Sequence, residues 1–146
     1  MKIGIRKALP ADKELIRTLL SEVKLPVENV DSGVTSFYIA EDERAVLGVA
    51  GFEFYGDDVL LRSVAIRPGL QQQGIGSQVV GMMIAEARRN NVNEIVLLTE
   101  TAKDFFLARG FKVVDRSTVS NDAMRRSSEF AYACPKSAVC MRMYLK

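Results

Sequence analysis

The chain has 146 residues, of which 48% are hydrophobic and 26% charged, a size and balance typical of one compact globular domain over residues 1–146. Its net charge is +2 and its acidic and basic residues are interspersed, which argues against nucleic acid or a membrane surface as a partner. Because no apolar stretch approaches the roughly 20 residues that span a bilayer, and the N-terminus lacks the apolar segment of a signal peptide, we expect a cytoplasmic protein.

The first predicted elements are a strand and an amphipathic helix. Residues 3–7 form a short apolar strand. Pro10 stands where the first turn of a helix tolerates proline, and apolar residues then recur at helical spacing until Pro26. The residues of this apolar face are Leu15, Ile16, Leu19, Leu20 and Val23. Residues 27–32 allow at most a turn or two before the chain extends again.

The middle of the chain is rich in predicted strands. Apolar segments at residues 36–40, 45–55 and 59–66 are separated by the polar turns 41–43 and 56–58. Turns this short join strands that run in opposite directions. We therefore predict an antiparallel meander of three strands.

From residue 67 onwards, predicted helices and strands alternate. A glycine-rich loop leads into a helix that ends near Asn90. A buried strand is predicted at residues 94–98, and a second helix ends at Gly110. With a further strand near residues 111–114, this half of the chain indicates a β-α-β-α arrangement.

The tail of the chain is less regular and carries both cysteines. Residues 115–126 are polar and poorly patterned, and residues 137–145 predict a last strand. Because the chain has no histidine, Cys134 and Cys140 cannot complete a zinc site of three or four nitrogen and sulfur ligands. The cytoplasm would keep both thiols reduced. We expect no metal ion and no disulfide.

The loop at residues 66–76 lies between an apolar strand and a helix. Such a loop aligns free backbone N–H groups with the positive end of the helix dipole, an arrangement that suits a pyrophosphate. Gly74 and Gly76 would let the backbone approach the phosphates closely. Glycines at a helix start are also ordinary turn residues, and the pattern is neither a P-loop nor a Rossmann turn. By itself the loop leaves a phosphate site and a plain turn as alternatives.

The spacing Gln71-x-x-Gly74-x-Gly76, preceded by an apolar strand and Pro68, resembles motif A of the GNAT N-acetyltransferases, (Gln/Arg)-x-x-Gly-x-(Gly/Ala). Ala8 and Asp12 resemble the opening helix of that family, and residues 105–111 resemble its late helix with the Gly-Phe ending, so the resemblance spans nearly the whole chain. It implies an α/β (α+β) fold with a mixed, mostly antiparallel sheet of six or seven strands. Helices flank this sheet, which splays open between strands four and five.

The resemblance also implies that acetyl-coenzyme A, as cosubstrate, lies in that opening. Its pantetheine arm would pair with the main chain of strand four at Val64, Ala65 and Ile66. Backbone N–H groups of the following loop would hold the pyrophosphate. The residues of this loop are Gln71, Gln72, Gln73, Gly74, Ile75, Gly76 and Ser77.

Acetyl transfer requires a neutral amine, a donor for the developing oxyanion and a proton for the departing thiolate. The resemblance implies that a backbone N–H of strand four serves the oxyanion. The family commonly places a Tyr where this chain has Phe106, so we assign no catalytic acid. A thiol with a pKa of about 8.5 leaves tolerably well without a strong acid, and water or the hydroxyl of Thr99 or Thr101 could serve.

Two charged residues on predicted strands are the candidates for acceptor chemistry. Alternation places Glu53 on the face opposite to Phe52 and Phe54, where it could relay the amine's proton through water. A solvated strand carboxylate is the alternative. Arg62 interrupts an apolar strand and could bind a carboxylate of the acceptor, or it could be a surface arginine paired with Glu53 or Asp58. Glu100 is a third candidate with less support.

Residues 97–106, 126–130 and 134–141 are similar to amino-acid N-acetyltransferases. The two branches most similar are the N-acetylglutamate synthase domain and the small arsenic-resistance-associated N-acetyltransferases. The synthases clamp glutamate with arginines where this chain has Val27, Glu28 and Pro135, which favours the second branch and argues against glutamate as the acceptor. We expect Cys134 and Cys140 to be buried structural cysteines. An arsenic site formed by the two cysteines is the alternative.

The expected function is therefore transfer of an acetyl group to the amine of a small molecule, an amino acid or an analogue of one. One alternative is an acyl-coenzyme A sensor or regulatory domain without transferase activity. Another is a protein-lysine acetyltransferase, against which the chain shows no acidic run for a basic peptide. A homodimer is compatible with the sequence, which leaves the oligomeric state open.

Overall fold

The computed structural model describes residues 2–130 and 138–146. Within these residues seven strands are hydrogen bonded in the order β1-β2-β3-β4-β5-β7-β6. The chain divides into two compact units, the first comprising Met1–Glu53 and Leu61–Glu86 and the second Phe54–Leu60 and Ala87–Lys146. Strands β3 and β4 contribute residues to both units.

The first unit contains the predicted meander together with the N-terminal strand. β1 (Gly4–Lys7) pairs antiparallel with β2 (Ser36–Glu41), and β2 pairs antiparallel with β3 (Val46–Tyr55). The adjacent strand is β4 (Asp58–Ile66), whose end is anchored to β3 by a hydrogen bond from Arg67 N–H to the Leu47 carbonyl at 2.9 Å. The predicted meander is confirmed.

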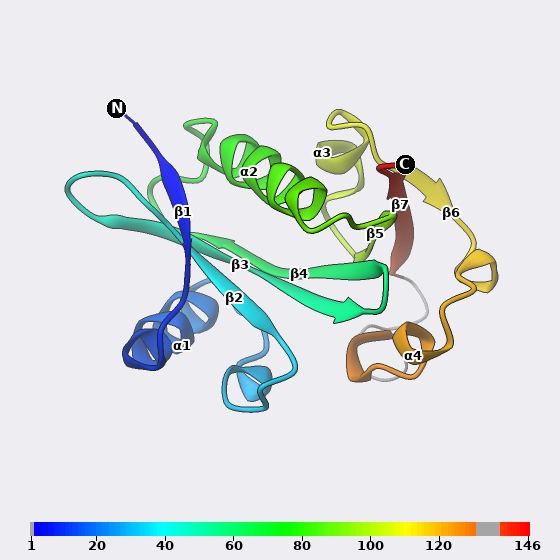
Figure 1. Cartoon of the computed structure of the whole chain (residues 1–146). Helices are drawn as coiled ribbons and strands as arrows, with labels where there is room; N and C mark the ends of the chain where they lie inside the picture. The colour runs from blue at the N-terminus through cyan, green and yellow to red at the C-terminus, as the bar shows by residue number, and fades with distance from the viewer. Residues whose placement is uncertain (1, 131–137) are drawn as a thin grey trace. The chain divides into compact units, whose positions relative to one another are not determined.

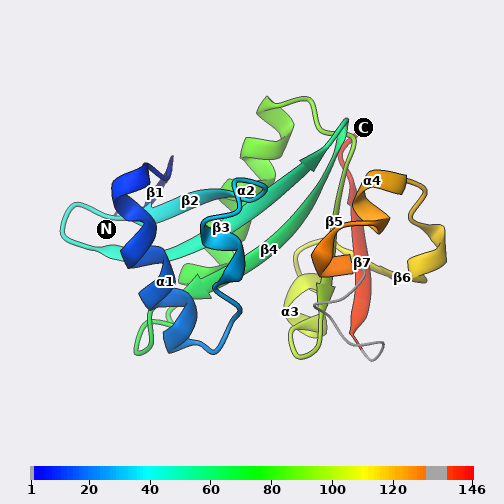
Figure 2. The ribbon, with the colours of Figure 1, turned by 90° about the horizontal axis from the view of Figure 1, so that it is seen from below.

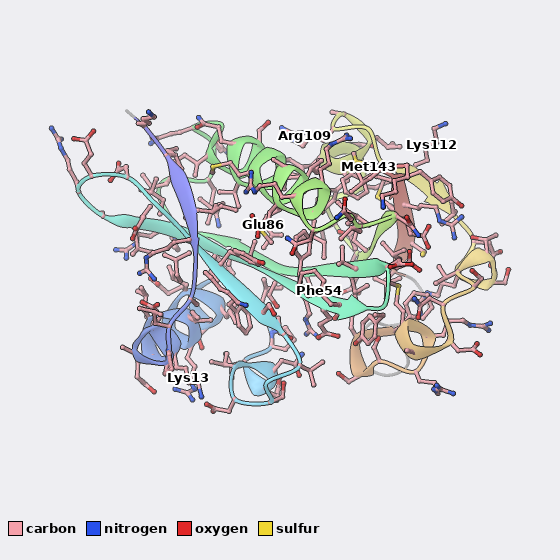
Figure 3. All side chains as sticks on the ribbon, in the orientation of Figure 1. Lys13, Phe54, Glu86, Arg109, Lys112 and Met143 are labelled. Atoms are coloured by element: carbon pink, nitrogen blue, oxygen red, sulfur yellow. The ribbon has the colours of Figure 1, made fainter. Side chains whose placement is uncertain are left out.

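Helices α1 (Lys13–Glu22) and α2 (Ile75–Arg89) cover opposite faces of the strands of the first unit (Figures 1 and 2). On one face, the apolar stripe of α1 packs against β2 and β3, because Phe37, Ile39 and Val49 all point to that side. On the other face, the Tyr38 hydroxyl donates a hydrogen bond to Glu86 of α2 at 3.4 Å (Figure 3). Strand β2 is therefore buried from both sides, and its residues 37–40 are all buried.

Two short 3-10 turns, η1 (Pro10–Asp12) and η2 (Glu28–Val30), flank α1. The helix ends where Lys24 adopts a left-handed backbone with a φ of 61°, two residues before the predicted break at Pro26. Leu25 N–H returns to the Leu20 carbonyl at 2.9 Å, which closes the last turn. The chain then crosses η2 on its way to β2.

The second unit holds the rest of the sheet. The first residues of β4, Asp58–Leu60, pair in parallel with Glu94–Val96 of β5 (Glu94–Thr99). β7 (Val139–Tyr144) pairs antiparallel with both β5 and β6 (Lys112–Val114). The mixed, mostly antiparallel sheet is thus confirmed, and the opening of the sheet beyond the paired start of β4 and β5 stays a prediction.

Each predicted strand begins and ends within two residues of its observed bounds, but the tail of the chain is more regular than expected. After α3 (Lys103–Leu107), the polar residues 115–126 form η3 (Arg116–Thr118) and α4 (Asp122–Arg125). The Asn121 side chain starts α4 by accepting a hydrogen bond from Met124 N–H at 3.0 Å. The poorly patterned sequence showed no sign of these short elements, because side-chain caps rather than apolar periodicity define them. No helix in residues 2–130 or 138–146 has the length and apolar character needed to cross a bilayer.

Candidate active site

The loop between β4 and α2 leads into the N-terminal end of a long helix, where backbone N–H groups have no acceptor within the helix. Gly69 and Gly74 adopt left-handed backbones with φ of 90° and 78°, a region that glycine enters without steric cost. The first hydrogen bond of α2 runs from Gln78 N–H to the Gly74 carbonyl at 3.2 Å. The N–H groups of Ile75, Gly76 and Ser77 therefore precede any acceptor within the helix.

Two glutamine side chains brace this loop from within. Gln71 Nε2 donates to the Ile66 carbonyl at 3.3 Å, which ties the loop to the end of β4. Gln73 Nε2 donates to the Gly69 carbonyl at 3.4 Å. The loop therefore holds its shape through its own side chains, while its residues 71–74 stay exposed.

The surroundings of the loop suit a negatively charged ligand. α2 has no acidic residue in its first turn, so no carboxylate opposes the positive end of the helix dipole. A Cβ placed on Gly74 would meet no other atom within 4 Å, so the backbone there faces open space. The residues present therefore fit the pyrophosphate site that the sequence predicts.

β4 is irregular just before the segment predicted to pair with pantetheine. Ser63 adopts a left-handed backbone with a φ of 57°, which costs a non-glycine residue about 1 kcal/mol or more. Beyond it, Val64 is half-buried, whereas Ala65 and Ile66 are buried. A Cβ on Gly48 would lie 2.5 Å from the Ala65 carbonyl oxygen, so glycine is what lets β3 approach β4 here.

Glu53 and Arg62 form a buried ion pair in the first unit. Arg62 Nη1 donates to Glu53 Oε2 at 2.9 Å, and each side chain is only 2% exposed. The sequence offered a surface arginine paired with Glu53 or Asp58 as one alternative; the pairing with Glu53 is observed, but neither side chain is solvated or at the surface. Both side chains lie on the α1 face of the sheet, because Glu53 is in phase with Val49 on β3.

Three further polar side chains, Asn29, Thr35 and Ser63, contact this pair. Thr35 Oγ1 donates to Glu53 Oε2 at 2.9 Å, and Arg62 Nε donates to Ser63 Oγ at 3.3 Å. In the amide orientation that satisfies both groups, Asn29 Oδ1 accepts hydrogen bonds from Arg62 Nη1 and Nη2. The cluster of Asn29, Thr35, Glu53 and Arg62, called here the buried polar cluster, thus joins η2, the start of β2, β3 and β4.

Sequence reasoning missed Asn29 and Thr35, although one of them left a signal. Ser36 pairs with Phe52 in the sheet, and continuing this register by one residue places Thr35 opposite Glu53. Asn29 lies in η2, where no periodicity relates it to a strand 33 residues later. Its contact with Arg62 could be found only from the folded chain.

The segment that carries Asn29 is also tied to α1. Asp31 accepts from Arg17, and Lys13 Nζ lies 3.5 Å from Asp31 Oδ1 (Figure 3). The Arg17 hydrogen bond lowers the pKa of Asp31 below its ordinary value. These ion pairs are exposed, in contrast to the buried contacts on the other side of the segment.

The other candidates lie in the second unit. Phe106 is buried and packs edge to face against Phe105 and Phe111, with ring centroids 5.0 and 5.4 Å away. Thr99 Oγ1 accepts from Ala102 N–H at 3.0 Å and so shapes the turn before α3. Glu100 is exposed. These positions give Phe106 a packing role, as its apolar ring suggests.

The cysteines can be placed only in part. Cys140 is a free thiol that is 2% exposed, and burial raises its pKa. Cys134 lies outside the described residues, as does Pro135, which stands where the synthases have an arginine. Within residues 2–130 and 138–146, the structure contains no group of three or more side chains that could hold a metal ion.

Comparison with known proteins places this geometry in a family. The model of the acetyltransferase (GNAT) domain matches residues 33–113. An uncharacterized N-acetyltransferase of Chlorobaculum tepidum is 27% identical over 119 residues, which cover 81% of this chain and 74% of that protein. The amino-acid acetyltransferase of Mycobacterium tuberculosis is 28% identical over 135 residues, covering 86% and 76%.

A solved structure extends the similarity to the whole fold. The N-acetylglutamate synthase of Neisseria gonorrhoeae, complexed with coenzyme A and N-acetyl-glutamate, superposes with a TM-score of 0.82 at 19% identity. The match covers 100% of this chain and 36% of the synthase, so the chain spans about a third of that protein's length. Because the family model matches more than half of the chain, the protein belongs to the GNAT acetyltransferase domain family.

Proposed function

We propose that this protein transfers the acetyl group of acetyl-coenzyme A to the amine of a small molecule, an amino acid or an amino-acid analogue. The observation that carries the proposal is the loop between β4 and α2. Its left-handed glycines and the open N-terminus of α2 form an anion site directly after a strand whose backbone is irregular. Membership of the GNAT family supports acetyl transfer as the use of this site.

In this proposal the main chain of the first unit holds the coenzyme. The N–H groups of residues 71–77 bind the pyrophosphate, and residues 64–66 pair with the pantetheine arm by strand addition. Gln71 and Gln73 contribute by holding the loop in its binding shape. No side-chain charge is required, since oriented N–H dipoles supply the attraction.

Acetyl-coenzyme A supplies the acetyl group as a thioester, and the amine nitrogen forms the new C–N bond as the C–S bond breaks. The nitrogen loses a proton in this exchange and the thiolate gains one. In our proposal a backbone N–H of β4 beyond Ser63 stabilises the oxyanion, and Glu53 accepts the amine's proton through water. Phe106 cannot donate a proton, and we assign no catalytic acid.

The acceptor is proposed from the relatives and from the charge in the first unit. One relative is named an amino-acid acetyltransferase, and the synthase structure contains N-acetyl-glutamate. Both names refer to amino acids, which are small molecules that bear an amine and an acid group, and we propose an acceptor of this class. The sequence predicts Arg62 as a ligand of that acid group, but its guanidinium already donates to Glu53 and Asn29.

The proposal is tested by release of free coenzyme A thiol from acetyl-coenzyme A with a panel of acceptors. The panel holds the common amino acids, amino-acid antimetabolites, spermidine and a lysine peptide, with mass spectrometry of the products. We expect an amino acid or analogue to give the highest kcat/KM. If spermidine or the peptide outcompetes all of them, the acceptor class is wrong.

A thermal shift separates the coenzyme site from the transfer reaction. Acetyl-coenzyme A at a hundredfold excess over Kd stabilises the native state by roughly 2.7 kcal/mol. A clear shift without turnover of any acceptor would favour a coenzyme-binding regulatory domain. The absence of both would contradict the loop assignment itself.

A further inference from the structure

We infer that Asn29 and Thr35 are positioning residues for acetyl transfer, because they hold the Glu53–Arg62 pair in a single geometry. In this view Arg62 acts through Glu53 rather than as a ligand of the acceptor. The inference rests on the proposed function and assigns roles within the same site.

The carboxylate of Glu53 is fixed by two donors on one oxygen. Arg62 Nη1 and Thr35 Oγ1 both lie 2.9 Å from Oε2, and the Glu53 side chain is 2% exposed. Charge-assisted hydrogen bonds of this length are about twice as strong as neutral ones. Two of them, one from β4 and one from the residue before β2, restrict the rotation of the carboxylate, which a proton-accepting group needs in order to face its substrate consistently.

The guanidinium of Arg62 is engaged at each of its three nitrogens. Nε donates to Ser63 Oγ, Nη1 donates to Glu53 and Asn29, and Nη2 donates to Asn29. A carboxylate of the acceptor could bind there only by displacing Asn29 or Glu53. Displacing Glu53 would leave a buried carboxylate without its cation, which is strongly unfavourable. The geometry therefore favours Arg62 as the partner that fixes Glu53.

The backbone is shaped to admit this cluster. A Cβ on Gly51 would lie 2.7 Å from the Thr35 methyl group and 3.4 Å from the Arg62 carbonyl oxygen. The missing side chain at Gly51 thus makes room for Thr35 to reach Glu53. Arg62 also directly precedes Ser63, whose left-handed backbone starts the segment proposed to bind the coenzyme. The buried polar cluster therefore anchors β4 next to the reacting groups.

A stabilising role alone explains the cluster less well. Well-packed apolar side chains of similar volume often stabilise a core as well as a buried ion pair does. Within the described residues, Arg62 is the one cationic side chain among the buried polar residues of the protein. A buried pair with additional hydrogen-bonding partners at Asn29, Thr35 and Ser63 is better suited to orient a carboxylate than to stabilise the fold.

The test compares matched variants of Thr35 and Asn29. Thr35→Val removes the hydroxyl and keeps the shape, Thr35→Ser keeps the hydroxyl, and Asn29→Ala removes the amide. Asp31→Asn is the control, because it breaks only the exposed ion pairs of the same segment. For each variant we would measure the melting temperature, the Kd of acetyl-coenzyme A, and kcat and KM for the best amino acid of the panel.

We expect Thr35→Val and Asn29→Ala to lower kcat by roughly ten- to a hundredfold, the range for losing one hydrogen bond to a charged group. The KM for the amino acid and the Kd of acetyl-coenzyme A should stay within about threefold, because neither residue is a ligand in this view. Thr35→Ser should recover most of kcat. Asp31→Asn should match the wild type.

Several results would overturn the inference. One is an unchanged kcat in both Thr35→Val and Asn29→Ala, and another is an equal loss in Thr35→Ser, which would indicate packing rather than the hydroxyl. A rise in the KM of the amino acid with kcat unchanged would make the cluster an acceptor site. If the wild type binds acetyl-coenzyme A but acetylates nothing in the panel, the proposed function fails first, and this inference falls with it.

Discussion

The buried ion pair predicts that a second mutation restores most of the stability lost in a first one. Arg62→Met removes the cation and leaves the Glu53 carboxyl group, which is 2% exposed, without its ion-pair partner. Removing one partner of a buried pair costs about 3–5 kcal/mol. For a chain of this length the melting temperature should fall by roughly 10–20 °C.

The second mutation should reverse most of that loss. In the variant Arg62→Met with Glu53→Gln, the side chain at position 53 is neutral and can still accept from Thr35. We expect it to be within about 2 kcal/mol of the wild type and clearly more stable than Arg62→Met alone. Both variants should lose acetyl transfer, so stability and activity would move separately.

Urea denaturation followed by circular dichroism measures these differences, with the m value as a check that the transition stays two-state. A cost below about 1 kcal/mol for Arg62→Met would mean that the pair behaves like an exposed one. A double variant that is less stable than Arg62→Met would show that the two side chains stabilise the fold independently. Either result would refute the reasoning.

Three other predictions concern the loop, the glycines and the N-terminus. Gly74→Asp should weaken acetyl-coenzyme A binding in calorimetry by about tenfold or more compared with Gly74→Asn, which has the same shape without the charge; equal affinities would contradict the pyrophosphate assignment. Gly51→Ala should lower the free energy of unfolding by about 1–3 kcal/mol, because the new Cβ would lie 2.7 Å from the Thr35 methyl group. Gly81→Ala, in open space on α2, should instead raise it by up to about 1 kcal/mol. Chemical denaturation measures both variants, and an unchanged stability of Gly51→Ala would show that the site can relax. The Arg6 hydrogen bond lowers the pKa of Asp12 to about 2; its stabilisation is therefore present above the unfolded pKa and lost as the pH falls through the folded one. Asp12→Asn should thus be less stable than the wild type above pH of about 4, by about 1 kcal/mol after solvent screening, and the difference should shrink as the pH falls through about 2 and disappear only below it; a difference that does not shrink between pH 4 and pH 2 would rule out the charge as its cause.

Most of the fold could be predicted because apolar residues that become buried recur at regular spacing along the sequence. The apolar face of α1 and the apolar segments of β3 and β4 each carry enough periodic residues to define an element, and turns with Gly56 or Pro68 mark their limits. The helix in the tail could not be predicted in this way, since the four residues of α4 are too few to show a periodic pattern. Its start depends on one Asn121 side chain, which also reaches the Tyr55 carbonyl at 2.7 Å.

The site could be predicted only where it follows from local sequence. Residues 71–77 were predicted to bind the pyrophosphate from their resemblance to motif A, because their glycines and their place before a helix alone left a plain turn as an alternative. Alternation also put Glu53 on a defined face of its strand, and Arg62 was noticed as a charge that interrupts an apolar strand. Their burial was not predictable, because it depends on η2 and on the space above Gly51, which only tertiary packing brings to them.

The residues proposed to bind the pyrophosphate, 71–77, determine the range over which they can attract a ligand. None of them has a charged side chain, so their own attraction comes from amide dipoles. The field of a dipole falls off faster with distance than that of a charge, and it adds little to diffusional steering. A phosphate ligand would therefore be attracted only at short range, with little long-range electrostatic steering towards this loop. Its association rate should vary less with ionic strength than in a site lined with lysine or arginine, where salt screens the attraction over about 8–10 Å.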